Sequence, residues 1–272
     1  MRYTECPFSP HNPLTILAHN MSLLRFDPVH PDFEQLETLV IAIDGPAGAG
    51  KSTVAIKLAQ ALGFEFLDTG AMYRCVTLAA IRAGVQLSDH HSVFELAKGL
   101  KIELGRATVS LNGEDVSEAI RSPDVTSLIQ SVADNIQVRE LLSKWQREWS
   151  HGKRVVTEGR DQGSEVFYDS PCKIFLVASS EERARRRQEE LAGKGTHVSL
   201  ETILAQQNAR DLQDATRPVG ALRKAEDAIE FSTDGLSLEQ VCENLIHLIR
   251  QKLELPLVNL RISTPKVQRQ ES

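Results

Sequence analysis

A run of nine residues, 45–53, has the composition and spacing of a phosphate-binding loop. It fits the pattern GxxxxGK[ST], in which glycines let consecutive backbone N–H groups surround a phosphate chain. Lys51 could reach the outer phosphates, and the Ser52 hydroxyl could ligate Mg²⁺. The pattern predicts that a nucleoside triphosphate binds through Gly45, Pro46, Ala47, Gly48, Ala49, Gly50, Lys51, Ser52 and Thr53.

The residues on either side of this loop predict the elements that would hold it. Residues 39–43 form an apolar, β-branched run, which is typical of a strand buried on both faces. Residues 52–62 place apolar side chains at helical spacing. A strand, a glycine loop and a helix in this order begin a parallel α/β sheet, and the helix directs its positive end at the phosphates. This context argues against a plain glycine-rich turn.

Arginines at the ends of predicted elements are a second group of residues that could do chemistry. Guanidinium groups bind phosphates through paired hydrogen bonds, and transfer of a phosphoryl group between two anions needs such charge cancellation. Arg160 follows Gly159 at the end of a predicted strand, where glycine lets the backbone approach a ligand. The arginines selected by this argument are Arg74, Arg139, Arg160, Arg183, Arg187, Arg210 and Arg217.

The charged segment 181–190 has a simpler alternative explanation. Glutamates and arginines four residues apart can stabilise a solvated helix without contacting a ligand. For Arg185 and Arg186 both explanations stay open, whereas for Arg183 and Arg187 we favour a functional role.

Two other classes of phosphate-binding protein are disfavoured by the sequence. A guanine-nucleotide switch needs the strings NKxD and DxxG, and neither occurs. An ATP-driven motor or transporter usually has a long apolar strand that ends in Asp. The nearest candidate, residues 154–158, is short and ends in Glu158.

The composition indicates an ordinary globular protein. The chain has 272 residues, of which 41% are hydrophobic and 25% charged, and its net charge is −6. This acidic balance disfavours binding to a nucleic acid polymer, and no apolar run approaches the roughly 20 residues that span a bilayer. The four cysteines have the spacing of neither a zinc site nor a disulfide framework, so we expect free thiols in the cytoplasm.

The rest of the chain predicts alternating strands and helices with one interruption. Residues 100–117 alternate in polarity around an Asn112-Gly113 turn signal, which predicts an antiparallel patch inserted into a βαβ pattern. Further strands are expected at 64–67, 154–157, 173–177 and 228–231, and further helices at 70–83, 123–133, 136–150, 181–191, 199–216 and 237–254.

Two pairs of side chains could be mistaken for ligand-binding groups. We interpret His90 and His91 as a solvated turn, because no carboxylate or cysteine spacing beside them suggests a metal site. We interpret Trp145 and Trp149 as core packing, since residues four apart lie on one face of a helix.

Ordered motifs run through the chain from about residue 39 to residue 253: IDGPAGAGKST (43–53), FLDTGAMYR (66–74), NGEDVSEAIR (112–121), VREL (138–141), EGRDQGSEVF (158–167), KIFLVASSEERARRR (173–187) and RDLQDATR (210–217). Together they resemble those of bacterial cytidylate kinase, the nucleoside-monophosphate kinase family specific for CMP and dCMP. The match is specific enough to name a substrate, which the chemistry of the residues alone does not.

The resemblance implies a fold. It implies an α/β protein, a three-layer P-loop kinase with a parallel central sheet, an inserted monophosphate-binding subdomain and a short lid. The parts would be a core of 39–69, 151–182 and 199–255, a CMP-binding insert at about 70–150, a lid at about 183–198, a disordered extension at 1–38 and a flexible tail at 256–272.

The resemblance also implies roles for single residues. Lys51, Arg160, Arg183 and Arg187 would be catalytic, the last two as lid residues that meet ATP. It implies that Thr69, Arg74 and Arg160 lie near the CMP phosphate and that Arg139 and Asp161 contact the cytosine edge. It also implies that Arg210 and Asp214 lie on the sugar side and that Arg217 reaches the acceptor.

Several positions depart from the family pattern. Gln130 stands where a serine near the cytosine is common, and residues 220–222 read Gly-Ala-Leu instead of Ala-Pro-Leu, which predicts a less rigid loop. Glu158 in place of Asp and Thr69 in place of Ser keep the chemistry of the usual residues.

The implied activity is transfer of the γ-phosphoryl group of ATP to CMP or dCMP, with Mg²⁺ as cofactor and a monomer as the acting form. The acceptor is a phosphate oxygen already ionised near neutral pH, so no general base is required. Two alternatives stay open: a kinase for another acceptor, such as a UMP/CMP or AMP kinase, and a nucleotide-binding regulatory protein that has lost catalysis.

Overall fold

The computed structural model describes residues 38–105, 108–193 and 195–254. The disorder expected for residues 1–38 and the flexible tail expected at 256–272 therefore lie, apart from Thr38, outside the described residues. Within the described ranges, no helix is long and apolar enough to cross a membrane.

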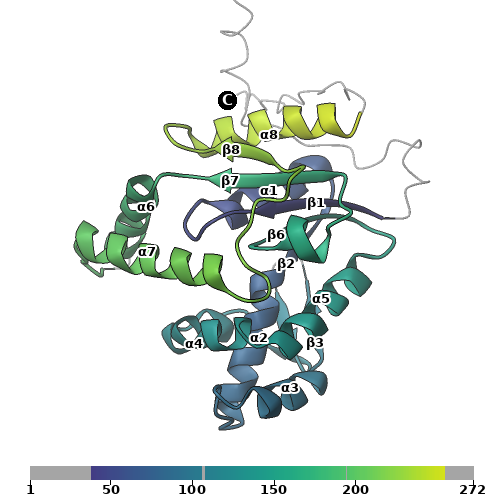
Figure 1. Ribbon diagram of the computed structural model, residues 1–272, viewed down its shortest axis with the longest axis vertical. Helices are drawn as coiled ribbons and strands as arrows, with labels where there is room; N and C mark the ends of the chain where they lie inside the picture. The colour runs from purple at the N-terminus through teal and green to yellow at the C-terminus, as the bar shows by residue number, and fades with distance from the viewer. Residues whose placement is uncertain (1–37, 106–107, 194, 255–272) are drawn as a thin grey trace, which may run out of the picture.

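Five parallel strands form the central sheet, in the order β2-β6-β1-β7-β8 (Figure 1). Their bounds are β1 Leu39–Asp44, β2 Glu65–Asp68, β6 Arg154–Gly159, β7 Cys172–Val177 and β8 Ile229–Ser232. Every residue of β1 is buried, because the strand lies in the middle of the sheet with helices on both faces. The predicted parallel sheet is confirmed.

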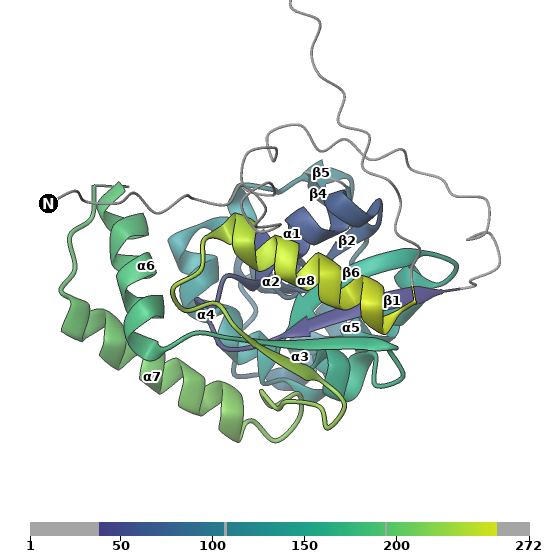
Figure 2. The same cartoon turned by 90° about the horizontal axis from the view of Figure 1, so that it is seen from above.

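Helices cover the sheet on both faces, which gives three layers (Figures 1 and 2). Ile41 and Ile43 of β1 face a core shared with α1 (Lys51–Leu62) and α8 (Leu238–Lys252). Val40 lies on the opposite face, since successive side chains of a strand alternate, and it joins a second core. The three-layer α/β fold that was predicted is therefore present.

The residues between β2 and β6 build a unit beside the sheet. It contains α2 (Thr69–Arg82), α3 (His90–Lys98), β3 (Ile102–Leu104), β4 (Val109–Leu111), β5 (Glu114–Asp115), η4 (Ala119–Arg121), α4 (Pro123–Ala133) and α5 (Ile136–Ser150). Strands β3, β4 and β5 pair antiparallel, as the polarity pattern predicted. A third apolar core joins this small sheet to α2.

The interpretation of His90 and His91 is wrong in its geometry. Both side chains are exposed, but they open helix α3, which the sequence analysis did not predict. The Asp89 carboxylate caps this helix by accepting a hydrogen bond from the Ser92 backbone N–H. Trp145 and Trp149, in contrast, pack against the second core as predicted.

Beyond β6 the chain makes a short π-helical turn, η5 (Gln162–Val166), before it enters β7. After β7, α6 (Ser180–Gly193) and α7 (Leu200–Thr216) run side by side and extend away from the end of the sheet (Figures 1 and 2). Cys75, Cys172 and Cys242 are buried and free, in agreement with the prediction, and Cys6 lies outside the described residues.

Candidate functional site

The loop 45–50 connects β1 to α1 and has the backbone shape that its glycines predict. Gly45, Gly48 and Gly50 have φ values of +152°, +81° and +89°, which other residues rarely adopt. A Cβ atom on Gly45 would lie 2.0 Å from the backbone oxygen of Leu176. The first glycine is therefore required by close packing against β7.

Lys51 is buried at the start of α1 and lies against the loop. Its Nζ donates a hydrogen bond to the backbone oxygen of Pro46 at 2.8 Å. Burial, followed by the positive charge of Arg160, lowers the pKa of Lys51 to about 7. An anionic phosphate beside the ammonium group would favour its charged form, so this lysine has the environment expected of a phosphate ligand.

Glu158 holds the other side of the loop and was not assigned a role by the sequence analysis. It is the second-to-last residue of β6, directly beside β1, and its Oε1 accepts a hydrogen bond from Ser52 Oγ at 2.8 Å. Thr69 Oγ1 donates to the backbone oxygen of the same glutamate at 2.7 Å. A hydroxyl and a carboxylate are the oxygen donors that Mg²⁺ prefers, so these two side chains fit the predicted ion.

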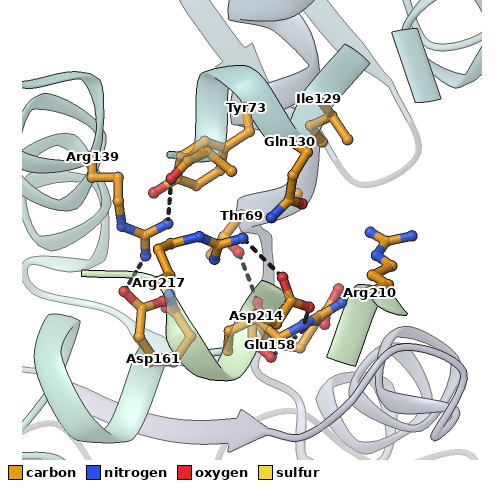
Figure 3. Close-up of a pocket in the computed structure, with 15 residues that line it drawn as sticks. Thr69, Tyr73, Ile129, Gln130, Arg139, Glu158, Asp161, Arg210, Asp214 and Arg217 are labelled. Atoms are coloured by element: carbon orange, nitrogen blue, oxygen red, sulfur yellow. Dashed lines mark hydrogen bonds and ion pairs between the residues drawn. The ribbon is translucent and has the colours of Figure 1, made fainter. Parts of the chain in front are cut away.

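A polar pocket opens beside the phosphate-binding loop (Figure 3). Its lining comes from α2, α4, α5, the end of β6 and the residues after it, and α7 and the residue after it. The structure thereby brings together most of the predicted CMP-binding residues, namely Thr69, Arg139, Arg160, Asp161, Arg210, Asp214 and Arg217. Tyr73, Ile129, Gln130 and Ala133 also line the pocket.

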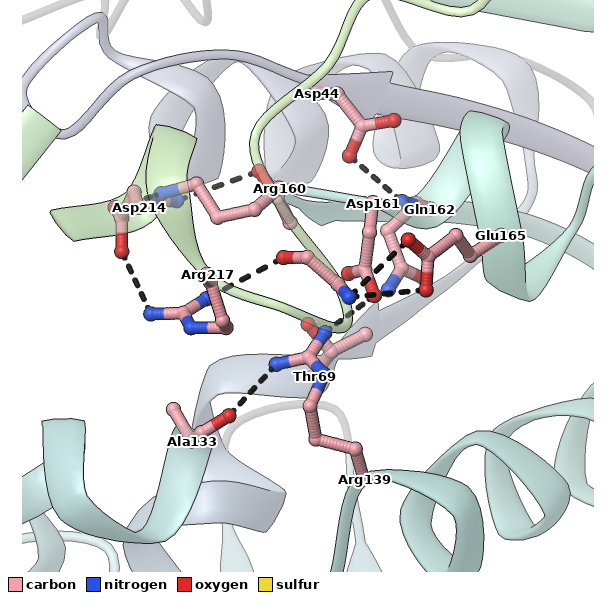
Figure 4. Close-up of polar contacts among 12 residues, drawn as sticks. Asp44, Thr69, Ala133, Arg139, Arg160, Asp161, Gln162, Glu165, Asp214 and Arg217 are labelled. Atoms are coloured by element: carbon pink, nitrogen blue, oxygen red, sulfur yellow. Dashed lines mark hydrogen bonds and ion pairs between the residues drawn. The ribbon is translucent and has the colours of Figure 1, made fainter. Parts of the chain in front are cut away.

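At one end of the pocket Arg139 and Asp161 form a buried ion pair. Arg139 also donates to the backbone oxygen of Ala133 at 3.1 Å, and its guanidinium lies 5.5 Å from the centre of the Tyr73 ring. These contacts fix a cation and a carboxylate side by side, with donors and an acceptor facing one edge of the pocket (Figures 3 and 4).

Asp214 connects two arginines at the centre of the pocket (Figure 4). It accepts from Arg160 Nε at 2.7 Å and from Arg217 Nη2 at 2.8 Å. Burial raises the pKa of Asp214, but the charges of Arg160 and Arg217 outweigh it and the pKa is lowered. Arg217 also pairs with Asp134, at 2.6 Å, and no motif in the sequence had indicated a role for this aspartate.

Arg210 is the pocket arginine with the least satisfied guanidinium. Its buried Nε has no hydrogen-bond partner within the described chain. Burial, followed by the charge of Arg160, lowers its pKa. A buried cation beside other cations is stabilised by an incoming anion, which is the chemistry needed to bind a phosphate.

Arg74 does not line this pocket. It donates to the backbone oxygen of Ile120 at 3.0 Å and to Thr126 Oγ1 at 2.8 Å, so it ties α2 to α4. Its contact with the CMP phosphate stays a prediction.

The arginines of α6 separate into two groups. Arg183 is buried and donates a hydrogen bond to the backbone oxygen of Ala47 at 2.9 Å, so it contacts the phosphate-binding loop directly. Arg187 instead pairs with Glu190 on the exposed surface. Arg185 pairs with the half-buried Glu182 and the exposed Glu189 of its own helix, whereas Arg186 contacts Thr233 as well as Glu182.

Asp44 is a further site residue that the sequence analysis missed. It ends β1 immediately before the loop, and its carboxylate accepts hydrogen bonds from the backbone N–H groups of Gln162 and Gly163 at 2.8 and 2.7 Å. Burial raises its pKa to about 7. Asp44 thus joins the phosphate-binding loop to the segment that carries Arg160 and Asp161. The position of Asp44 directly before Gly45 was the feature of the sequence that could have indicated its role.

The loop that was predicted to be less rigid carries specific contacts. Gly220 has φ +67°, and its N–H donates to the Glu165 carboxylate. A Cβ atom at this position would lie 1.7 Å from Arg139 Nη2. The departure from alanine therefore leaves room for the arginine at the cytosine end of the predicted site. Gln130 lines the pocket and donates weakly to Asp134 at 3.4 Å.

A parallel three-layer fold, a phosphate-binding loop after its central strand and an arginine-rich pocket beside that loop together define a P-loop phosphotransferase. The model of the cytidylate kinase family matches residues 41–251. The chain belongs to the cytidylate kinase family, which confirms the resemblance drawn from its motifs.

Relatives that are similar in sequence agree with this assignment. A cytidylate kinase of Rhodopirellula baltica is 50% identical over 221 residues, covering 81% of this chain and 96% of that protein. A cytidylate kinase of Caldanaerobacter subterraneus is 48% identical, and the match covers 79% of this chain and 96% of that protein. A bifunctional pantoate ligase/cytidylate kinase of Trichormus variabilis is 46% identical, but only 42% of its length is matched. Among solved structures, a shikimate kinase of Acinetobacter baumannii has a TM-score of 0.41 at 16% identity, covering 83% of this chain and 98% of that one.

Proposed function

We propose that the chain transfers the γ-phosphoryl group of ATP to CMP or dCMP, giving ADP and CDP or dCDP. The observation that carries this proposal is the pocket itself. Asp214 shared between Arg160 and Arg217 lies beside the buried Arg139–Asp161 pair, next to a phosphate-binding loop. A cation-rich centre suits the acceptor phosphate, and a paired cation and carboxylate suit the edge of a base.

The chemistry of Asp161 favours cytosine over uracil. A carboxylate accepts hydrogen bonds, and cytosine presents an amino group where uracil presents a carbonyl oxygen. Uracil would place two acceptors against each other in a buried site, which is a strong source of discrimination. Arg139 could donate to the N3 nitrogen and the O2 carbonyl of cytosine, whereas uracil offers only the carbonyl because its N3 carries a hydrogen.

The transfer step needs positioning and charge cancellation rather than a base. The acceptor oxygen is ionised near neutral pH, so Lys51 and the pocket arginines would hold two anions in line and stabilise the charge on the moving phosphoryl group. Ser52 and Glu158 would hold Mg²⁺ directly or through water, and the bound ion would neutralise charge on the phosphate oxygens.

Arg183 and Arg187 retain their proposed place in a lid that closes over ATP, with a hinge near Gly193 and Gly195. Gly195 has φ +77°, which suits a turn between α6 and α7. Closure would exclude water and prevent hydrolysis of ATP. We also propose that the chain acts as a monomer in the cytoplasm, and its buried free thiols support a reducing compartment.

An acceptor screen tests the proposed function. The purified chain is incubated with ATP and Mg²⁺ and with CMP, dCMP, UMP or AMP in turn, and ADP formation is followed. CMP and dCMP should exceed UMP and AMP by at least about 100-fold in kcat/KM. Equal use of UMP would favour the broader UMP/CMP kinase, and tight ATP binding with no CDP formed would favour the regulatory protein.

A further inference from the structure

The inward face of α7 is polar, which is unusual for a helix that docks on a protein core. Of its buried residues Ile203 is apolar, whereas Gln207 and Asp214 are not. Gln207, Asp211 and Asp214 follow each other at spacings of four and three, so they form one stripe along the helix. A helix attached by polar contacts can change its position at a lower cost than one attached by a packed apolar stripe.

The first half of this stripe contacts the phosphate-binding loop. Arg183 connects Asp211, at 2.7 Å, to the backbone oxygen of Ala47, at 2.9 Å. The Gln207 amide also lies close to Gly48: a Cβ atom on that glycine would be 3.2 Å from Gln207 Nε2. The position of α7 is therefore linked to the conformation of residues 47–48.

The second half of the stripe contacts the pocket. Asp214 pairs with Arg160 at 2.7 Å, and Arg217, directly after the helix, pairs with Asp134 at 2.6 Å. One turn of helix separates Asp211 from Asp214, so a displacement at the loop must move the pocket residues as well.

Three buried atoms on or beside this stripe have no hydrogen-bond partner within the described residues: Gln207 Oε1, Arg210 Nε and Asp211 Oδ1. Unsatisfied buried polar atoms are costly, and native proteins contain few of them. These atoms cluster along one face of α7. A different position of α7 against the core could therefore give them the hydrogen-bond partners that they lack here.

We propose that Asp211 and Gln207 are positioning residues that couple the two nucleotide sites through α7, so that binding at the phosphate-binding loop strengthens binding in the pocket. Arg183 serves as the link between Asp211 and the loop. The proposal rests on the proposed function, because it takes ATP as the ligand of the loop and CMP as the ligand of the pocket. By linkage, CMP must strengthen ATP binding by the same factor.

The test measures CMP binding by calorimetry with and without saturating Mg²⁺ and adenylyl imidodiphosphate, a non-hydrolysable ATP analogue. For the wild-type chain the analogue should tighten CMP binding by at least about 5-fold. In Asp211→Asn this factor should fall below about 2-fold, while each nucleotide alone binds within about 3-fold of wild type. Asp211→Glu should restore most of the coupling, and Gln207→Leu should lower it.

Glu189→Gln is the matched control, because it breaks the exposed Arg185–Glu189 pair on the other face of α6 and should leave the coupling factor unchanged. A coupling factor near 1 for the wild-type chain, or an unchanged factor in folded Asp211→Asn and Gln207→Leu, would overturn the inference. If the wild-type chain forms no CDP, the proposed function fails too. CDP formation with unchanged coupling removes the inference alone.

Discussion

The phosphate-binding loop and the pocket beside it are made in different ways. The loop consists of consecutive residues, 45–53, and its shape comes from glycines that adopt positive φ angles. The pocket consists of residues from α2, α4, α5, α7, the end of β6 and the segment after it, held by ion pairs between arginines and aspartates. A site made of backbone should depend on very few side chains, whereas a site made of ion pairs should weaken with the loss of each one.

The largest effect is expected at Lys51, the side chain on which the loop depends most. Lys51→Ala should lower kcat by about 1000-fold or more, because it removes the cation that we propose stabilises the transferred group. The melting temperature should stay near that of wild type, since burial disfavours the charged lysine. Lys57→Ala, on the exposed face of the same helix, is the control and should keep full activity. Wild-type-like activity of Lys51→Ala would refute the mechanism.

The next effect tests the pocket. Asp161→Ala leaves the buried Arg139 guanidinium without its partner, so we expect kcat/KM for CMP to fall about 100-fold and the free energy of unfolding to drop by about 3 kcal/mol. The KM for ATP should change by less than about 3-fold. Steady-state kinetics and urea denaturation measure both. Glu114→Ala breaks the exposed pair with Arg82 and should alter neither quantity.

A smaller effect is expected at Gly220, whose backbone packs against the side chain of Arg139 in the pocket. Gly220→Ala should raise the KM for CMP about 10-fold, because the added methyl group must displace Arg139. Gly235→Ala is a matched control, since Gly235 has a similar φ of +72° but no atom within 4 Å of the added Cβ. Equal kinetic effects of the two substitutions would show that backbone strain alone is responsible.

The smallest effect concerns Asp44, which joins the two regions. Its pKa of about 7 in the folded chain exceeds the usual value of 3.8. At pH values between 3.8 and 7, Asp44 therefore keeps its proton in the folded state but has lost it in the unfolded state. The stability of wild type relative to Asp44→Asn should therefore fall by about 1 kcal/mol per pH unit from pH 5 to 7, then level off. Urea denaturation of both proteins across this range measures the difference, and parallel pH curves would contradict the assignment.

The same contrast explains what could be predicted from the sequence. Residues 123–133 and 136–150 were predicted with the bounds that the structure shows. Ser122 and Asn135 cap these helices, and a cap depends only on residues close in the sequence. The phosphate-binding loop is equally local. Helix α3 was missed because it has only nine residues and two histidines at its start.

The pocket was predictable only in part. Residue types selected the arginines, and the family resemblance placed Arg139, Asp161 and Asp214 near a nucleotide. Partners that depend on how distant elements dock, such as Asp134 with Arg217, left no trace in the sequence pattern. Arg74 shows the opposite case, because its position in a motif did not reveal that it would contact Ile120 and Thr126.

The order of the strands also has a consequence for synthesis of the chain. Strand β1 lies between β6 and β7, so Leu39 pairs with Arg154 and Ile41 with Cys172. These partners leave the ribosome long after β1 and the phosphate-binding loop. Gly45 packs closely against Leu176 of β7, so we expect the loop to take its final shape only when β7 is available. Nascent chains that end before residue 172 should therefore fail to retain ATP, and the polyphosphate site should mature late, after the unit between β2 and β6 has formed.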